Sequence, residues 1–286
     1  MPAIITGAAG FIGSHLRNKL GSKTKCCDPA DLSMMCPSTL EEIINNKKLS
    51  IEAVFHLGAI SSTTESNIIK LTDNNILFSC RLLDACIKNN IPFVYASSAS
   101  VYGAGKYGFE EDVSLSPLNY YAISKASFDM YVNQKIKDNP LAKIVGLRYF
   151  NVYGKNEEHK KDMASPVHKF WKQANDTGII KVFEGSEEFY RDFIHVDDVV
   201  NITYNAQYFT NSGIYNVGTG KSRSFMDVAE IIASICKAEI KQIPFPNHLA
   251  DKYQKYTQSN NNKIINAGIT EKYTTLENGI REVISD

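Results

Sequence analysis

Residues 3–20, AIITGAAGFIGSHLRNKL, join a short apolar run to a glycine-rich turn and a helix-like segment. The run 3–6 has the composition of a buried strand, and 11–20 has the periodicity of a helix. Between them, GAAGFIG at 7–13 places glycines three residues apart. Glycines at this spacing allow a tight turn, the close approach of a pyrophosphate and close helix packing. The pattern therefore predicts a dinucleotide-binding start, with phosphates at the helix N-terminus.

The alternation of strand-like and helix-like segments continues along the first half of the chain. Strand-like runs at 24–27, 53–57, 92–96 and 144–147 alternate with helix-like segments at 75–88 and after Pro117. That order predicts an α/β fold, a Rossmann-type doubly wound parallel sheet with helices on both faces. After Gly154 the loops become more charged and the elements shorter. We expect an NAD(P)-binding domain at 1–154, to which 190–217 returns, and a smaller C-terminal substrate-binding domain at 155–286.

The composition points away from several classes of partner. The 31 basic and 31 acidic residues cancel, so neither a nucleic acid nor an anionic membrane is expected to bind. The sequence shows no basic-then-apolar leader, and no apolar run approaches the roughly 20 residues of a membrane helix. Six cysteines without C-x-x-C spacing favour reduced thiols. We expect a cytoplasmic protein.

Several short motifs bear on the C-terminal half. SFMD at 224–227 and TTLE at 274–277 have the form of capping boxes and predict helix starts. GTGKS at 218–222 resembles the end of a phosphate-binding loop, but Tyr215 occupies the position of its first glycine, which argues against an NTP site. Neither a G-x-S-x-G elbow nor an H-E-x-x-H zinc helix is present, and we expect no metal.

A serine, a tyrosine and a lysine form the candidate catalytic group. SSASVYG at 97–103 follows the fourth expected strand, where open α/β sheets place ligands. Tyr121 and Lys125 are four residues apart and share one helix face. A nearby ammonium and a cationic nicotinamide favour the phenolate, and moving its pKa from near 10 to about 7 takes roughly 4 kcal/mol. Tyr121 then acts as a general base, with the Ser98 hydroxyl bound to the sugar oxygen. The alternative, a pair that only packs, is usual for this spacing in isolation.

The choice between NAD and NADP depends on residues after the second strand. Asp28 would accept a hydrogen bond from a ribose 2′-hydroxyl, which favours NAD. Asp31 is an alternative acceptor, and Lys25 could compensate a 2′-phosphate. The residues leave both cofactors open.

The glycine loop, SSASVYG and Tyr121-x-x-x-Lys125 resemble the extended short-chain dehydrogenase/reductase superfamily across nearly the whole chain. Further stretches resemble the ADP-glyceromanno-heptose 6-epimerase family: SSTTE (61–65), DNN (73–75), IPFVYASSA (91–99), RYFNVYG (148–154), EEHKKDMAS (157–165), FEGSEEFYRDF (183–193) and IPFPNHLADKYQKYTQ (243–258). The resemblance implies a Rossmann domain with a small substrate domain, a homo-oligomer, and a preference for NADP. It also implies inversion of C6″ of an ADP-heptose used for lipopolysaccharide core.

The resemblance and the glycine loop together imply a set of contacts. Cofactor contacts would be Gly7, Gly10, Phe11, Ile12, Gly13, Asp28, Leu57, Gly58, Ala59, Ile60, Ser61, Asn74, Lys125, Val152 and Lys160. Substrate contacts would be Asn151, Asp162, Lys169, Phe183, Glu184, Gly185, Ser186, Arg191 and Tyr253. Arg191 suits a pyrophosphate, because a guanidinium binds phosphate oxygens bidentately. Two features depart from the family: a small residue usually stands at Asp162, and the stretch 28–53 is shorter than usual.

The resemblance also assigns a role to Lys160 in NEEHKKDMAS (156–165). A carbon not acidified by a carbonyl is inverted most easily by removing hydride, leaving a ketone, and returning the hydride to the other face. The hydroxyl then occupies two positions, and each needs a proton carrier. Tyr121 serves one position, and Lys160 matches the second base of the resembled family, with His159 orienting the loop. The alternative is a solvated loop lysine, the common fate of lysine.

Two classes of rival function remain, a related nucleotide-sugar enzyme and a protein without catalysis. A nucleotide-sugar 4,6-dehydratase needs a carboxylate pair beside the catalytic serine, whereas Ala99 and Ser100 follow Ser98. A nucleotide-sugar 4-epimerase needs no Lys160. A non-catalytic NAD(P)-binding scaffold or sensor, from another class, would tend to lose the Tyr121–Lys125 pair.

Overall fold

The computed structural model describes residues 3–21, 24–27, 37–46, 49–104, 111, 114–246, 254–269 and 272–285. Two residues that the sequence assigns to ligand contacts, Asp28 and Tyr253, lie outside these ranges, as do Asp31 and the loop around it. The contacts of those residues therefore stay predictions.

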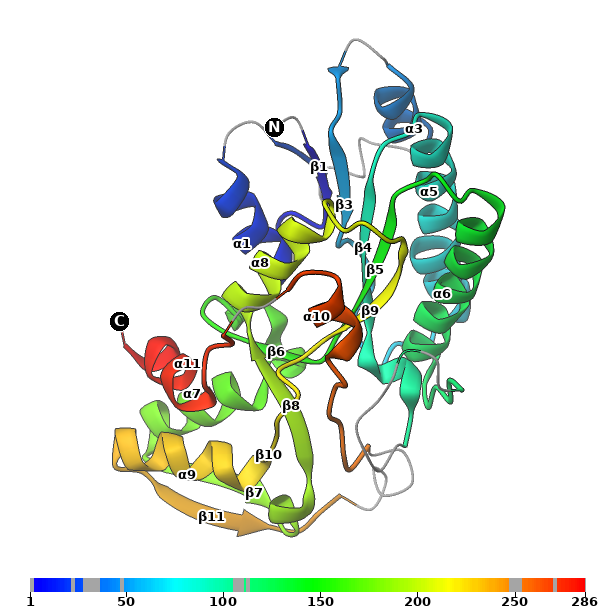
Figure 1. Cartoon of the computed structure of the whole chain (residues 1–286). Coiled ribbons are helices and arrows are strands. Elements are labelled where there is room, and N and C mark those ends of the chain that lie inside the picture. Colours follow the sequence, from blue (N-terminus) through cyan, green and yellow to red (C-terminus); the bar gives the residue numbers. More distant parts are fainter. Residues whose placement is uncertain are drawn as a thin grey trace.

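A six-stranded parallel sheet forms the centre of the structure, in the order β2-β1-β3-β4-β5-β9 (Figure 1). Its strands are β1 (Ala3–Thr6), β2 (Lys25–Cys27), β3 (Ala53–His56), β4 (Phe93–Ser98), β5 (Ile144–Tyr149) and β9 (Gly213–Val217). The chain moves outward from β1 to β2, and then in the opposite direction through β3, β4 and β5. Ligands bind at the carboxyl ends of strands beside such a switch point. The sheet confirms the Rossmann-type α/β fold predicted from the sequence.

Helices cover both faces of this sheet (Figure 1). One face carries α1 (Phe11–Leu20) and α8 (Val196–Ala206), and the other carries α3 (Pro37–Asn45), α5 (Phe78–Lys88) and α6 (Tyr120–Asp138). Successive strand residues point to opposite faces, so Ile5 and Phe55 pack with α1 and α8, while Ile4 and Val54 pack with the other layer. Strands β1, β3, β4 and β5 are largely buried, which explains their apolar runs.

The C-terminal half adds two small sheets. In the first, β6 (Asn151–Tyr153) pairs in parallel with β8 (Tyr190–His195), which pairs antiparallel with β10 (Ser222–Ser224). In the second, β7 (Ile179–Phe183) pairs in parallel with β11 (Glu239–Ile243). A separate apolar core joins them to α7 (Pro166–Thr177), α9 (Phe225–Cys236) and α11 (Leu276–Ile284). Between α9 and α11, α10 (Asn262–Asn266) packs against β9.

The segment 190–217, which we expected to return to the first domain, divides between the two halves of the structure. Its strand β9 joins the central sheet, and its helix α8 packs against α1. Its strand β8 lies instead in the three-stranded sheet. The chain therefore passes through both sheets within this one segment.

The helix expected at 75–88 begins earlier and is not uniform. It starts with α4 (Ile68–Leu71), continues as a π-helical turn, η3 (Thr72–Leu77), and ends with α5. Within the described residues, 3₁₀ turns occur at η4 (Ala99–Tyr102), η5 (Glu158–Met163) and η6 (Ser186–Glu188). A π-turn inserts one extra residue into a helix and is frequent at functional sites.

One of the two expected capping boxes has the predicted geometry. Ser224 accepts a hydrogen bond from the Asp227 N–H, and the Asp227 carboxylate accepts one from the Ser224 N–H. At α11 the cap is Thr275, one residue later than expected. The side chain and N–H of Thr274 donate instead to the Asp198 carboxylate. Because Thr274 is bound to this acceptor, the predicted capping box does not form there.

Candidate functional site

The glycine loop joins β1 to α1 through close backbone contacts that leave no room for a side chain at Gly7 or Gly13. Gly7 has a φ of +72°, and a Cβ on Gly13 would lie 1.9 Å from the Gly7 carbonyl oxygen. Helix α1 begins after Gly10, which offers no side-chain cap to the first turn. The first N–H groups of a helix have no partners within it, so this end of α1 can bind an anion. The loop fits the pyrophosphate of a dinucleotide.

The loop after β3, which contains the predicted cofactor residues 57–61, lies directly against the glycine loop. The Leu57 N–H donates to the Thr6 carbonyl oxygen at 3.1 Å, and the Gly58 N–H donates to the Thr6 hydroxyl at 3.1 Å. A Cβ on Gly7 would lie 2.6 Å from the Gly58 Cα. The structure thus brings together two segments assigned to the cofactor, 50 residues apart in sequence.

The buried asparagine of the π-turn η3 is Asn75, not Asn74. The exposed Asn74 side chain donates to the Lys70 carbonyl at 2.8 Å, so its cofactor contact stays a prediction. The buried Asn75 side chain accepts from the Ile60 N–H at 2.9 Å and donates to the Ile60 carbonyl and the Ser124 hydroxyl, each at 3.0 Å. Asn75 therefore ties the β3 loop to the helix that carries Tyr121. The sequence did not single out Asn75, because it lies beside another asparagine and because the π-turn that buries it could not be predicted.

Ser98, Tyr121 and Lys125 gather at the carboxyl end of β4. Ser98 is the last residue of β4, two residues beyond the strand end expected from the sequence. Tyr121 and Lys125 lie in the first turns of α6, which Asn119 caps by accepting from the Ala122 N–H. Tyr121 is partly buried and hydrogen-bonded to Ser98. The structure thus brings together the three residues that the sequence predicts to be catalytic.

The electrostatics of this group differ from the sequence expectation. Burial raises the pKa of Tyr121, a hydrogen bond with Ser98 lowers it, and the Asp129 carboxylate raises it again, with a net increase. The Lys125 ammonium donates to the Ala96 carbonyl at 2.8 Å and is not among these causes. Burial lowers the pKa of Lys125 to about 8, against the opposing charge of Asp129. Without a ligand, Tyr121 is a protonated phenol.

A buried ion pair lies beneath the catalytic helix, and the sequence analysis missed it. Asp129, one turn beyond Lys125, accepts from Arg148 Nε at 2.9 Å and from the hydroxyls of Tyr95 at 2.8 Å and Ser97 at 3.0 Å. Both charged side chains are almost fully buried. The pair joins α6, β4 and β5, so it fixes the base of the site. The sequence signal that could have revealed the pair is the spacing of Asp129, which lies four residues after Lys125 on the same helix face.

Lys160, the predicted second proton carrier, lies at the glycine loop. Its ammonium is 4.4 Å from the centroid of the Phe11 ring and 2.7 Å from Glu157 Oε2. Its side chain is 22% exposed, so it does not extend into bulk water. His159 is exposed. The sequence analysis named the lysine and overlooked the buried glutamate beside it.

The predicted substrate residues occupy the smaller half of the structure. Asn151 lies in β6, next to the predicted cofactor residue Val152, and the carbonyl oxygen of Asp162 accepts from Lys169 Nζ at 2.6 Å. Phe183 ends β7, and Glu184, Gly185 and Ser186 turn away from it, with Gly185 at a φ of +82°. Arg191, in β8, is buried against the Phe225 ring, 5.3 Å from its centroid, and donates to the Tyr190 carbonyl. Their contacts with a sugar stay predictions.

The backbone N–H groups of the GTGKS loop donate hydrogen bonds to a carboxylate of the protein. The N–H groups of Thr219 and Gly220 donate to the buried Asp192 at 2.7 and 2.9 Å, and Ser259 donates to it from both its N–H and its hydroxyl. These are the amides that a phosphate-binding loop would direct at its ligand. The contacts give the loop a structural role.

One cluster combines side chains of metal-binding type, but its hydrogen bond argues against a metal. His195 lies 3.8 Å from an Asp197 oxygen through Nδ1 and 3.9 Å from a Glu282 oxygen through Nε2. Nδ1 accepts from the Asp197 N–H at the start of α8, which leaves the proton on Nε2. A protonated ring nitrogen is a donor and cannot ligate a cation.

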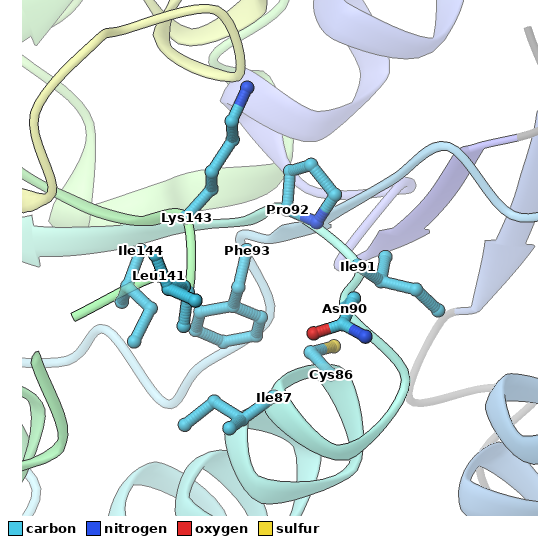
Figure 2. A pocket seen from close by; sticks show the side chains of 10 residues that line it. Cys86, Ile87, Asn90, Ile91, Pro92, Phe93, Leu141, Lys143 and Ile144 are labelled. Carbon is cyan, nitrogen blue, oxygen red and sulfur yellow. The ribbon is translucent and has the colours of Figure 1, made fainter. Parts of the chain in front are cut away.

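Two cavities among the described residues lie away from the candidate catalytic group. One of about 240 Å³ lies at the start of β4 and β5, where Cys86, Phe93 and Lys143 line it (Figure 2). Another of about 480 Å³ lies between β10 and the start of α11 and is lined by Arg223 and Thr275. None of the predicted site residues lines either cavity. The first is at the amino ends of the strands, opposite to the edge where such sheets bind ligands.

Comparison with known proteins agrees with this geometry. The NAD dependent epimerase/dehydratase family matches residues 3–218, which include the glycine loop, Ser98, Tyr121 and Lys125. The chain belongs to this family. NAD(P) is therefore the cofactor class of this chain. Among the described residues, no helix has the length and apolar composition that crossing a bilayer requires.

Individual relatives of this epimerase/dehydratase chain cover nearly its whole length. It is 41% identical over 307 residues to the ADP-L-glycero-D-manno-heptose-6-epimerase of Brachyspira hyodysenteriae, covering 98% of this chain and 95% of the relative. The crystal structure of the Helicobacter pylori enzyme of the same name superposes with a TM-score of 0.84 and 29% identity, covering 99% of this chain and 94% of that one. The UDP-glucose 4-epimerase of Thermotoga maritima gives a TM-score of 0.86 and 26% identity over 99% of this chain and 97% of that one.

Proposed function

We propose that the protein inverts C6″ of ADP-D-glycero-D-manno-heptose to give ADP-L-glycero-D-manno-heptose, for lipopolysaccharide core supply. The observation that supports this proposal is the placement of two side chains able to carry a proton, Tyr121 beside Ser98 and Lys160 over Phe11. The 41% identity to a heptose 6-epimerase supports the choice of substrate. The same relative supports adenine as the base.

Each residue of the site has a role in the proposed reaction. NAD(P)⁺, when bound, would accept the hydride of C6″ and supply it to the opposite face, and its positive charge would oppose the effect of burial on Tyr121. Tyr121 takes the hydroxyl proton in one orientation of the sugar, and Ser98 hydrogen-bonds the same oxygen. Lys160 exchanges the proton when the keto group has turned. Lys125 supplies positive charge beneath the site, and Arg191 binds the pyrophosphate.

NADP is the cofactor we propose, because the resembled family prefers it. Asp28 favours NAD on chemical grounds, and it lies outside the described residues. Mass spectrometry of the cofactor released from purified protein distinguishes the two. Recovery of NAD alone would overturn the NADP assignment and leave the epimerase proposal intact.

The decisive experiment is incubation with ADP-D-glycero-D-manno-heptose, with the C6″ epimers resolved by NMR. In D₂O we expect inversion without deuterium at C6″, because a hydride that leaves and returns does not exchange with solvent. Incorporation of deuterium would contradict the hydride mechanism. Conversion of UDP-glucose to UDP-galactose instead of the heptose would favour the 4-epimerase alternative, and no conversion of either would favour a non-catalytic binding protein.

We also propose a cytoplasmic homo-oligomer. Exposed apolar side chains cluster on the adjacent elements α4, η3 and α6, namely Ile68, Ile69, Leu77, Tyr120, Ile123 and Met130. Contiguous apolar patches on a soluble protein commonly mark contacts between chains. Light scattering after size exclusion should give a multiple of 31.9 kDa, and Met130→Glu should reduce it. A monomeric wild-type protein would overturn this proposal.

A further inference from the structure

The loop between β6 and α7 is closed around one buried carboxylate, Glu157. Its Oε1 accepts from the Gly154 N–H at 3.2 Å and from the Ser165 hydroxyl at 2.7 Å. Its Oε2 accepts from the Ser165 N–H at 2.7 Å and from Lys160 Nζ at 2.7 Å. The glutamate is 0% exposed. Four donors from three positions of the loop thus fix this carboxylate.

The carboxylate does not depend on Lys160. Gly154 at the end of β6 and Ser165 at the start of α7 supply three of its four hydrogen bonds. Both positions are buried and packed: a Cβ on Gly154 would lie 2.4 Å from a Val196 methyl carbon. Glu157 is therefore held in place by the ends of β6 and α7, independently of Lys160.

Lys160 has few other contacts. Besides Glu157, its ammonium lies over the Phe11 ring at 4.4 Å, and its neighbour Lys161 has a left-handed φ of 48°. A free lysine samples many rotamers, and fixing it costs conformational entropy. An exposed ion pair contributes little, but here one partner is anchored and fully buried. The geometry therefore fixes the amine at the first turn of α1.

We propose that Glu157 is the positioning residue of Lys160, holding its amine over Phe11 so that it meets one orientation of the sugar. This inference rests on the proposed function, in which Lys160 carries the second proton. Glu157 touches neither substrate nor cofactor and acts through the lysine. The loop thereby preorganises a flexible side chain, as a catalytic group requires.

Glu157→Gln tests the proposal, with Glu158→Gln as the matched control, because Glu158 is the adjacent and exposed glutamate. We expect kcat to fall about 10- to 100-fold in Glu157→Gln with KM unchanged, and both constants to stay unchanged in Glu158→Gln. A wild-type kcat in folded Glu157→Gln would overturn the proposal. If that variant does not fold, Glu157→Asp replaces it, because its shorter side chain cannot reach Lys160 and Ser165 together. It should show the same selective loss of kcat, and a wild-type kcat would overturn the proposal.

A double-mutant cycle with Lys160→Met separates positioning from a merely structural role. A proton carrier contributes about 10²- to 10⁴-fold, so the residual turnover of Lys160→Met is measurable by NMR over long incubation. Adding Glu157→Gln should leave that residual turnover unchanged, since the residue through which it acts is gone. An equal further loss in the double variant would overturn the inference. Full turnover of Lys160→Met alone would instead overturn the two-carrier mechanism of the proposed function.

Discussion

The ammonium of Lys125 donates a hydrogen bond of 2.8 Å to the carbonyl oxygen of Ala96 in β4. Helix α6 thereby attaches its catalytic face to the central sheet, two residues before Ser98. The bond directs the lysine charge to the strand end, and the Tyr121 phenol is left with Ser98 as its hydrogen-bond partner. Burial makes this charge sensitive to pH.

Activity should fall as the pH rises through about 8. Burial lowers the pKa of Lys125 to about 8, so the ammonium, which the site needs, is present below that pH and lost above it. The measurement is a profile of kcat/KM from pH 6 to 10. Lys125→Arg keeps its charge throughout this range, so any residual activity in that variant should lack the alkaline limb. A wild-type profile that is flat to pH 9.5 would contradict the role of the ammonium.

Tyr121→Phe should lower kcat about 10²- to 10⁴-fold, because it removes a proton carrier and leaves the ring in place. The adjacent Tyr120 is 47% exposed, and Tyr120→Phe is the matched control with unchanged kcat. Both are measured by NMR of the epimers, with thermal unfolding to establish that each variant folds. Equal activities in the two variants would refute the assignment of Tyr121.

Gly13→Ala should abolish cofactor retention. Its Cβ would lie 1.9 Å from the Gly7 carbonyl oxygen, so the glycine loop must open to accept it. Gly213→Ala is the control, since its Cβ would meet only ordinary contacts at 3.5 Å or more. Cofactor content per chain, read by mass spectrometry after gel filtration, should fall at least 10-fold in Gly13→Ala and stay unchanged in the control. Full cofactor content in Gly13→Ala would place the pyrophosphate elsewhere.

Stability should decrease as the pH falls below about 6.5, because of His56. Burial, followed by the charge of Lys125, lowers its pKa from 6.5 to about 3. The buried ring accepts from Thr6 and donates to Ser79, whose hydroxyl donates onward to Asn75. The unfolded chain thus binds a proton that the folded chain does not.

The resulting loss is about 1.4 kcal/mol per pH unit, or roughly 2 kcal/mol between pH 6.5 and 5. Urea unfolding at several pH values measures it. His56→Gln should remove this component of the slope, while His159→Gln, at an exposed position, should retain it. An unchanged slope in His56→Gln would show that other groups dominate the acid sensitivity.

The sequence predicted the central sheet and the proximity of Ser98, Tyr121 and Lys125 because both depend on local pattern. Apolar runs gave β1, β3, β4 and β5 nearly at their bounds, and Y-x-x-x-K spacing placed Tyr121 and Lys125 on one face. The expected start at residue 75 was wrong, because a π-turn depends on tertiary packing of Asn75 against Ile60.

The supporting carboxylates were not predictable in the same way. Glu157 and Asp129 look like ordinary charged residues in a loop and on a helix. Their burial follows only when Ser165 and Arg148 arrive from other elements to satisfy them. A buried carboxylate whose hydrogen-bond donors come from distant parts of the chain has no local sequence signature, whereas a glycine turn does.

A single buried residue, Phe150, separates β5 of the central sheet from β6 of the three-stranded sheet, and its N–H donates to Val217 at 3.0 Å. The return path is equally direct, since β8 runs into α8 without an intervening loop. These two connections are therefore short, and they leave little slack between β5 and β6 or between β8 and α8. In the proposed reaction, such short connections favour a turn of the sugar within the site over a movement of one half of the protein against the other.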